Sequence, residues 1–179
     1  GFIPADRRGV GSVTDLSLTD NALLGRQHSF TRARGWLLDR QRISQHARDI
    51  IARFAVRTPD AEFEAGKLSG GNLQKLILGR EVASNPCLLV VEQPTRGLDV
   101  GAIESVWQGL MAARDRGCAI LLISAELEEI INLSDRITVM YSGQIAGELT
   151  AAAATPERLG ELMAGAHLKK KGGGDEEAA

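Results

Sequence analysis

Cysteine and histidine are scarce in this sequence, with two cysteines and three histidines among 179 residues. Neither Cys87 nor Cys118 belongs to a Cys-x-x-Cys pair, and the histidines are scattered along the chain. This spacing disfavours a metal site or a disulfide framework and fits a protein of a reducing cytosol. Each cysteine opens an apolar run, so both are expected to fill space in a core.

Long apolar runs are also missing. No run approaches the roughly 20 residues that a membrane-crossing helix needs, and the first residues do not have the pattern of a signal peptide. The 44% hydrophobic and 25% charged residues are typical of a soluble globular protein. A length of 179 residues allows one domain or two small lobes, and any membrane role is expected to be peripheral.

Aromatic residues make up only 4% of the chain, and few of them lie between the eight arginines of residues 26–57. Arginines spread along a helical stretch with few aromatics are more typical of a solvated face than of a nucleic-acid groove. No nucleic-acid partner is therefore expected.

The patterns that are present change character along the chain. Residues 19–65 are predicted to be mostly helical, with the clearest apolar face at Ile43, Ala47, Ile50, Ile51 and Phe54. The patterns predict five segments: an opening segment (1–18), a helical subdomain (19–85), an α/β portion (86–150), a C-terminal helix (151–165) and a disordered tail (166–179).

Two apolar runs follow the helical part, CLLVVEQ at 87–93 and CAILLIS at 118–124. Each is continuous and ends in polar residues, which predicts fully buried parallel strands. A helical pattern lies between them, and a hairpin turning at Ser142-Gly143 and a helix starting at Thr155-Pro156 come later. The fold class is predicted as α/β, with part of a parallel sheet covered by helices.

The stretch KLSGGNLQKLILGREVA, residues 67–83, predicts an amphipathic helix with one buried face. Ser69 can cap its start, and two glycines leave the first backbone N–H groups uncovered. A helix N-terminus with a hydroxyl and free N–H groups is an anion site suited to phosphate. On this stretch alone, an ordinary Ser-Gly-Gly turn before a helix is the alternative.

These motifs together resemble those of the ATP-binding cassette (ABC) transporter ATPases. LSGGN is similar to the signature motif, LLVVEQPTRGLDVGA to the Walker B strand and D-loop, and ILLISAELEEI to the switch-histidine strand. The opening segment GFIPADRRGVGSVTDLSLTDNALL resembles the Q-loop region of simple-sugar and nucleoside importers, whose second tandem cassette carries PTRGxDVGA. The resemblance reaches to about Gly165 and implies a partial P-loop NTPase-like cassette with a helical signature subdomain.

In this family ATP lies between two cassettes, and the signature helix of one closes over the γ-phosphate held by the other. The resemblance therefore implies that Ser69, Gly70, Gly71 and Asn72 hold a phosphate of Mg-ATP bound to a partner cassette. It places Asp99 of the D-loop beside the nucleotide, although Asp99 could equally cap the following helix. It also implies membrane permease partners and a place on the cytoplasmic face of the inner membrane.

Four departures from the family pattern fall on the chain's own ATP site. No G-x-x-x-x-G-K-[ST] occurs in the sequence, and Ala125 stands where the switch histidine is expected. Glu92 replaces the magnesium-associated aspartate, with poorer geometry for Mg²⁺. Gln93 replaces the glutamate that polarises water, and losing general-base help typically costs about 10²–10⁴ in rate. Ala5 likewise occupies the Q-loop position.

These departures predict a degenerate, non-catalytic half that closes over ATP on a partner. Three alternatives stay open: an active ATPase whose P-loop lies upstream, a truncated interaction module without a nucleotide role, and a soluble ABC protein of DNA repair or translation. A parallel sheet without its early strands also predicts self-association through an uncovered edge and face.

Overall fold

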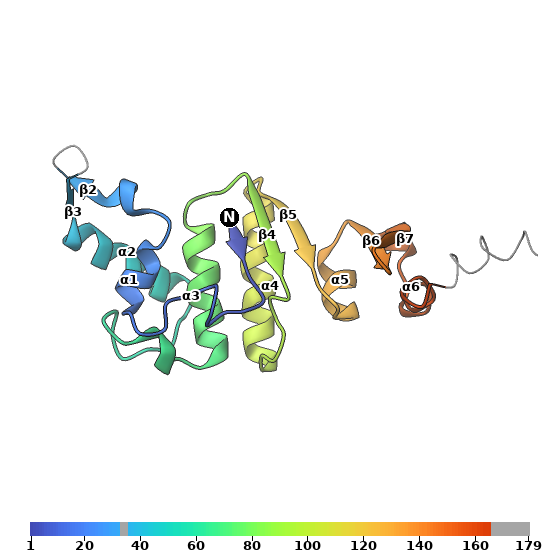
Figure 1. Ribbon diagram of the computed structural model, residues 1–179, viewed down its shortest axis with the longest axis horizontal. Helices are drawn as coiled ribbons and strands as arrows, with labels where there is room; N and C mark the ends of the chain where they lie inside the picture. The colour runs from blue at the N-terminus through green and yellow to red at the C-terminus, as the bar shows by residue number, and fades with distance from the viewer. Residues whose placement is uncertain (33–35, 166–179) are drawn as a thin grey trace, which may run out of the picture. The chain divides into compact units, whose positions relative to one another are not determined.

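A computed structural model describes residues 1–32 and 36–165 (Figure 1). The chain forms two compact units, Gly1–Ile123 and a second unit that begins at Ser124. The five-segment division remains a prediction, and the tail at 166–179 lies outside the described residues. No helix within the described ranges is long and apolar enough to cross a membrane.

The first unit contains a three-stranded parallel sheet with the order β1-β4-β5. Its strands are β1 (Phe2–Ile3), β4 (Leu88–Glu92) and β5 (Ala119–Ile123). The register aligns Phe2 with Val90 and Val90 with Leu121. The predicted α/β class with parallel strands is confirmed.

Two helices, α3 (Gly70–Val82) and α4 (Val100–Asp115), pack on one face of this sheet, where Leu89 and Val91 are completely buried. The strands alternate, so every second side chain points to the opposite face. The exposed side chains of this open sheet face are Phe2 (46% exposed), Leu88 (48%), Leu121 (54%) and Ile123 (49%). The prediction of fully buried strands is wrong for this face, because the described unit covers only one side of the sheet. The core prediction is confirmed for Cys118 and wrong for Cys87, which is exposed at the start of β4.

The helical part of the first unit consists of α1 (Leu18–Leu23), α2 (Arg40–Arg53) and α3. The predicted face of α2 is confirmed for Ile43, Ala47 and Ile50, which are buried, whereas Ile51 and the C-cap residue Phe54 are half-buried. The prediction that helix α3 is amphipathic is wrong. The helix is enclosed by α1, α2, α4 and β1, so its polar residues Gln74 and Arg80 are buried as well.

A small antiparallel hairpin interrupts the stretch that the sequence predicted as mostly helical. Strands β2 (Thr31–Arg32) and β3 (Leu37–Leu38) pair, with Thr31 opposite Leu38. Helix α2 starts only after Asp39, whose carboxylate caps it by accepting from the backbone N–H of Arg42 at 3.2 Å. The helical segments before it are short, since α1 ends at Leu23 and a 3₁₀ turn covers Gln27–Phe30.

The second unit contains α5 (Leu127–Leu133), the antiparallel strands β6 (Arg136–Tyr141) and β7 (Gln144–Thr150), and α6 (Pro156–Met163). The predicted turn is confirmed: Ser142 and Gly143 both have positive φ, at 47° and 78°, as a type I′ turn requires. The predicted Thr155 cap of α6 is confirmed too. The buried core of this unit consists of Ile137, Val139, Leu159 and Leu162.

Candidate functional site

The start of α3 presents an open anion-binding geometry. The Ser69 hydroxyl oxygen accepts from the backbone N–H of Asn72 at 3.4 Å and from the Asn72 side-chain amide at 3.0 Å. The N–H groups of Gly70 and Gly71 have no acceptor among residues 1–32 and 36–165. Because α3 is 13 residues long, its dipole adds positive potential at this end. Ser69 is exposed, so its hydroxyl is accessible to a ligand.

The four signature residues have different roles in the structure. A Cβ on Gly70 would have no neighbour closer than 3.7 Å, whereas a Cβ on Gly71 would lie 2.8 Å from the Cβ of Ala102 in α4. Asn72 turns its carbonyl oxygen to the backbone N–H of Arg57 at 2.8 Å. Ser69 is thus exposed, and Gly70 has room for a Cβ in ordinary van der Waals contact with Arg7 and Leu98. Gly71 packs closely against Ala102, and Asn72 bonds to Arg57.

Arg7 lies beside this helix start. Its Nε donates to the side-chain oxygen of Gln74 at 2.9 Å, its Nη2 donates to the carbonyl of Arg96, and its Nη1 lies 3.7 Å from the Cβ position of Gly70. Burial, and secondarily the charge of Arg96, lower the pKa of Arg7. An arginine still keeps its charge in a protein, so it adds to the positive potential near Gly70.

Asp99 joins the same corner from the D-loop side. Its Oδ1 accepts from the backbone N–H of Ala102 at 2.9 Å, which confirms the cap that the sequence allowed. Its Oδ2 lies 3.7 Å from the Cβ position of Gly71. We define the signature corner as Ser69–Asn72 with Arg7 and Asp99. A contact between Asp99 and nucleotide remains a prediction.

The carboxyl end of β4 carries Glu92 and Gln93. The backbone N–H of Gln93 donates to the carbonyl of Ile123 at 2.8 Å, and its φ of 46° places it in the left-handed region. Such a backbone is uncommon outside glycine and is a pointer to function. The side chain is a neutral amide, so the position cannot take a proton from water.

The structure offers little for a resident metal ion. No group of three or more histidine, cysteine, aspartate or glutamate side chains converges among the described residues. Glu92 is thus a single carboxylate, and a Mg²⁺ ion near it would need phosphate oxygens and waters as its other ligands. Ala125 comes two residues after the end of β5 and belongs to the second unit. Its side chain is only a methyl group, which cannot bind a phosphate.

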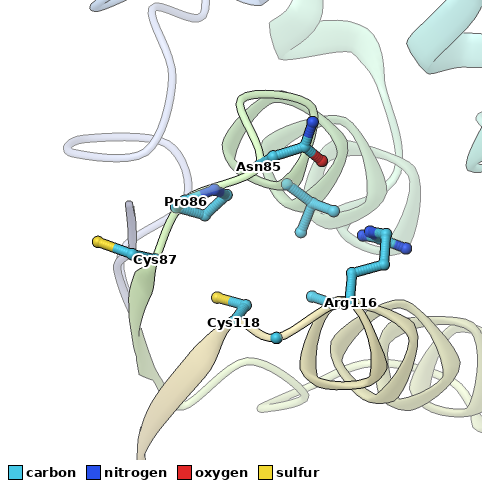
Figure 2. Close-up of a pocket in the computed structure, with 8 residues that line it drawn as sticks. Asn85, Pro86, Cys87, Arg116 and Cys118 are labelled. Atoms are coloured by element: carbon cyan, nitrogen blue, oxygen red, sulfur yellow. The ribbon is translucent and has the colours of Figure 1, made fainter.

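A separate hollow of about 440 Å³ lies at the other end of α3 (Figure 2). Asn85, Pro86, Arg116 and Cys118 are among its lining residues, at the ends of the helices and the starts of the strands. Ligands of parallel α/β sheets bind at the opposite, carboxyl edge. The hollow is therefore distinct from the signature corner.

Sequence reasoning missed Arg7, although the neighbouring Ala5 was singled out. The sequence signal is the pair Arg7-Arg8 after Asp6. Arg8 donates to the carbonyls of Gly66 and Leu68, and Asp6 accepts from the N–H groups of Arg8 and Gly9. Only the fold shows that this turn contacts a helix start more than 60 residues away.

No protein-family model matches the sequence. The chain is 46% identical over 172 residues to the guanosine import ATP-binding protein NupO of Bacillus subtilis and 44% identical over 170 residues to the nucleoside import ATP-binding protein NupA of Lactococcus lactis. It is 41% identical over 159 residues to a ribose import ATP-binding protein of Rubrobacter xylanophilus. The matches cover 96%, 95% and 89% of this chain and 34%, 34% and 32% of those proteins, so the chain spans about a third of their length.

Solved structures show the same fold. A dimeric ATP-binding cassette, MJ0796, bound to ADP and Pi matches with a TM-score of 0.68 and 21% identity, over 84% of this chain and 62% of that one. The transporter cassette MJ1267 matches with a TM-score of 0.69 and 20% identity, over 90% and 68%. Together with the relatives, these matches show that the chain is a partial cassette, the C-terminal part, of the ATP-binding cassette family, homologous to the ATP-binding proteins of nucleoside and sugar importers.

Proposed function

We propose that this chain supplies the closing surface of a composite ATP site in an importer of nucleosides or simple sugars. Its signature corner closes over the γ-phosphate of Mg-ATP held by a partner cassette. The other partners are membrane permease subunits, and the place of action is the cytoplasmic face of the inner membrane. The names of the relatives support the substrate class, and the resemblance supports the partners.

The free N–H groups at the start of α3 are the observation that carries this proposal. Two backbone donors and an exposed hydroxyl lie at the start of α3, and the charged Nη1 of Arg7 is 3.7 Å from the Cβ position of Gly70. Donors fixed in place before the ligand arrives stabilise developing charge on a phosphate without a reorganisation cost. Such a surface can bind a γ-phosphate presented by another domain and needs no P-loop of its own.

The residues of the chain's own ATP site support the proposal that this cassette does not hydrolyse ATP itself. Glu92, Gln93 and Ala125 lack the carboxylate geometry, the base and the imidazole that the resemblance implies for hydrolysis. An active cassette with its P-loop upstream is the second candidate, favoured by the chain's matching only about a third of its relatives' length. An upstream P-loop would restore ATP binding, but it would not replace the missing base.

Hydrolysis measurements test whether this half does chemistry. We expect phosphate release from Mg-ATP by the purified chain to stay at background. In the assembled importer, Gln93→Ala should leave ATP turnover within about twofold of wild type. A general base accelerates such a reaction by ~10²–10⁴, but an amide is not a base, so its removal should not cause a loss of that size. Turnover by the chain alone, or a hundredfold loss in Gln93→Ala, would show that the site is active.

A further inference from the structure

Arg7 joins three parts of the first unit that are far apart in the sequence. Its Nε donates to the side-chain oxygen of Gln74 in α3 at 2.9 Å, and its Nη2 donates to the carbonyl of Arg96 in the D-loop turn, residues 93–98 between β4 and α4. These contacts span 67 and 89 residues of the chain. In Figure 1 the dark-blue segment that follows β1 passes beside α3. One guanidinium thus ties the signature helix to the turn that leads into Asp99.

The backbone of Arg7 is held in a tight turn of its own. The Ser12 hydroxyl donates to the carbonyl of Arg7 at 2.7 Å, and the backbone N–H of Gly11 donates to the carbonyl of Asp6 at 2.9 Å. A Cβ on Gly11 would lie 2.8 Å from Cδ1 of Ile77, so this turn packs directly on α3. The guanidinium is therefore presented from a backbone that hydrogen bonds and packing already fix, as precise positioning of a site requires.

Gln74 makes the contact with Arg7 important for stability as well. Its side chain is completely buried, and its Nε2 has no hydrogen-bond partner among residues 1–32 and 36–165. The bond from Arg7 satisfies the oxygen of this amide, and leaving a buried polar atom unpaired is destabilising. An apolar residue of similar size at this position would need no partner. Stability and positioning can therefore be tested separately.

We propose that Arg7 is a positioning residue, which holds the D-loop turn and the start of α3 in one arrangement so that both meet the partner's phosphate together. The inference rests on the proposed function of the signature corner. Asp99 caps α4 through the backbone N–H of Ala102, and a Cβ on Gly71 would lie 2.8 Å from the Cβ of Ala102. A shift of the D-loop turn would thus reach the helix start, whose donors must be fixed before the phosphate arrives.

Arg7→Met removes both hydrogen bonds and keeps the apolar stem of the side chain. We expect the purified chain to unfold at a lower urea concentration, because the oxygen of Gln74 loses its donor. In the assembled importer, kcat for ATP hydrolysis should fall at least about tenfold. The apparent KM for ATP should stay within about threefold, because the partner cassette still holds the nucleotide.

Two further variants and one control separate positioning from structural support. Adding Gln74→Leu to Arg7→Met should restore the urea midpoint, since neither partner of the buried bond remains, but kcat should stay low because the carbonyl of Arg96 still lacks its donor. Arg7→Lys keeps the charge but not the planar fork that serves two acceptors, so kcat should stay low here too. The control is Arg48→Met, at an exposed arginine that donates to Gln45 of its own helix, and it should change neither quantity.

Recovery of kcat together with the urea midpoint in the double variant would overturn the proposal, because Arg7 would then only satisfy Gln74. A wild-type kcat in Arg7→Lys would also overturn it, since charge alone would suffice. Gly70→Asp, which places a negative charge at the helix start, tests the proposed function in the same importer. An importer inhibited by Gly70→Asp but not by the double variant would show that the helix start works without Arg7. An importer insensitive to Gly70→Asp would overturn the proposed function, and this proposal with it.

Discussion

At the residue scale, the two glycines of the signature motif show how one motif serves two purposes. A Cβ on Gly71 would lie 2.8 Å from Ala102, whereas a Cβ on Gly70 would fit at van der Waals distance from Arg7 and Leu98. From the sequence, both glycines are expected to have the same role, which is to leave backbone N–H groups uncovered. Only the packing of α3 on α4 separates a structural glycine from one that is free to meet a ligand.

His46 gives a residue-scale prediction about pH. Its ring packs against that of Phe30 in a tilted arrangement, with 4.9 Å between ring centres. Burial, then the charge of Arg26, lower the pKa of His46 from 6.5 despite an opposing effect of Asp49. The folded state therefore prefers the neutral imidazole. The stability this contributes is complete above the unfolded pKa and is lost as the pH falls from about 6.5 through the lower folded pKa.

We expect the urea midpoint of wild type to fall between pH 7.5 and pH 5. His46→Phe keeps a ring against Phe30 and cannot take up a proton, so its midpoint should fall less over the same interval. Identical pH dependence in the two proteins would show that His46 is not the group responsible.

At the element scale, α3 shows what the sequence could and could not predict. Its start and its Ser69 cap follow from local chemistry, and both are found in the structure. Its enclosure by four other elements could not be predicted, because Gln74 and Arg80 look like solvent-facing residues until their partners are known. The oxygen of Gln74 accepts from Arg7, and the Arg80 guanidinium lies 2.9 Å from Glu81.

For strands β4 and β5, the sequence predicted the pairing but not the burial. Continuous apolar runs correctly predicted parallel strands with polar carboxyl ends, including Glu92 and Gln93. The same runs predicted burial on both faces, since a run of this kind is typical of a strand covered on each side. The described unit leaves one face open. The pairing of β2 with β3 was missed because each strand has only two residues.

Packing of α6 on the β6-β7 hairpin gives an element-scale prediction. A Cβ on Gly147 of β7 would lie 2.7 Å from Leu162, whereas a Cβ on Gly160 of α6 would have nothing within 4 Å. We expect Gly147→Ala to destabilise the second unit by about 1–3 kcal/mol through overpacking. Gly160→Ala should stabilise it by about 0.5–1 kcal/mol, because alanine favours a helix interior. Thermal unfolding should show shifts of opposite sign, and shifts of the same sign would contradict the packing described.

At the scale of the whole molecule, the open sheet face predicts self-association. Phe2, Leu88, Leu121 and Ile123 expose apolar surface on strands, and β5 is an unpaired edge of the three-stranded sheet. We expect light scattering to report a dimer or a larger species for the purified chain. Leu121→Lys should shift the distribution toward monomer by placing a charge on this face, and a wild-type monomer over a wide concentration range would contradict the prediction.

In the proposed function, the start of α3 closes over a phosphate held by another cassette. A Cβ at Gly70 meets its neighbours Arg7 and Leu98 only at van der Waals distance, and the helix dipole stabilises an aspartate in the first turn of a helix. Gly70→Asp should therefore keep the fold and repel the phosphate. Gly70→Asn has nearly the same size without the charge, so it is the matched control.

The decisive experiment measures ATP hydrolysis by the assembled importer with wild type, Gly70→Asp and Gly70→Asn. We expect Gly70→Asp to lower turnover at least about tenfold, equivalent to ~1.4 kcal/mol, and Gly70→Asn to retain most of it. Wild-type turnover in Gly70→Asp would show that α3 does not close over the phosphate, because a negative charge could not be tolerated where a γ-phosphate binds.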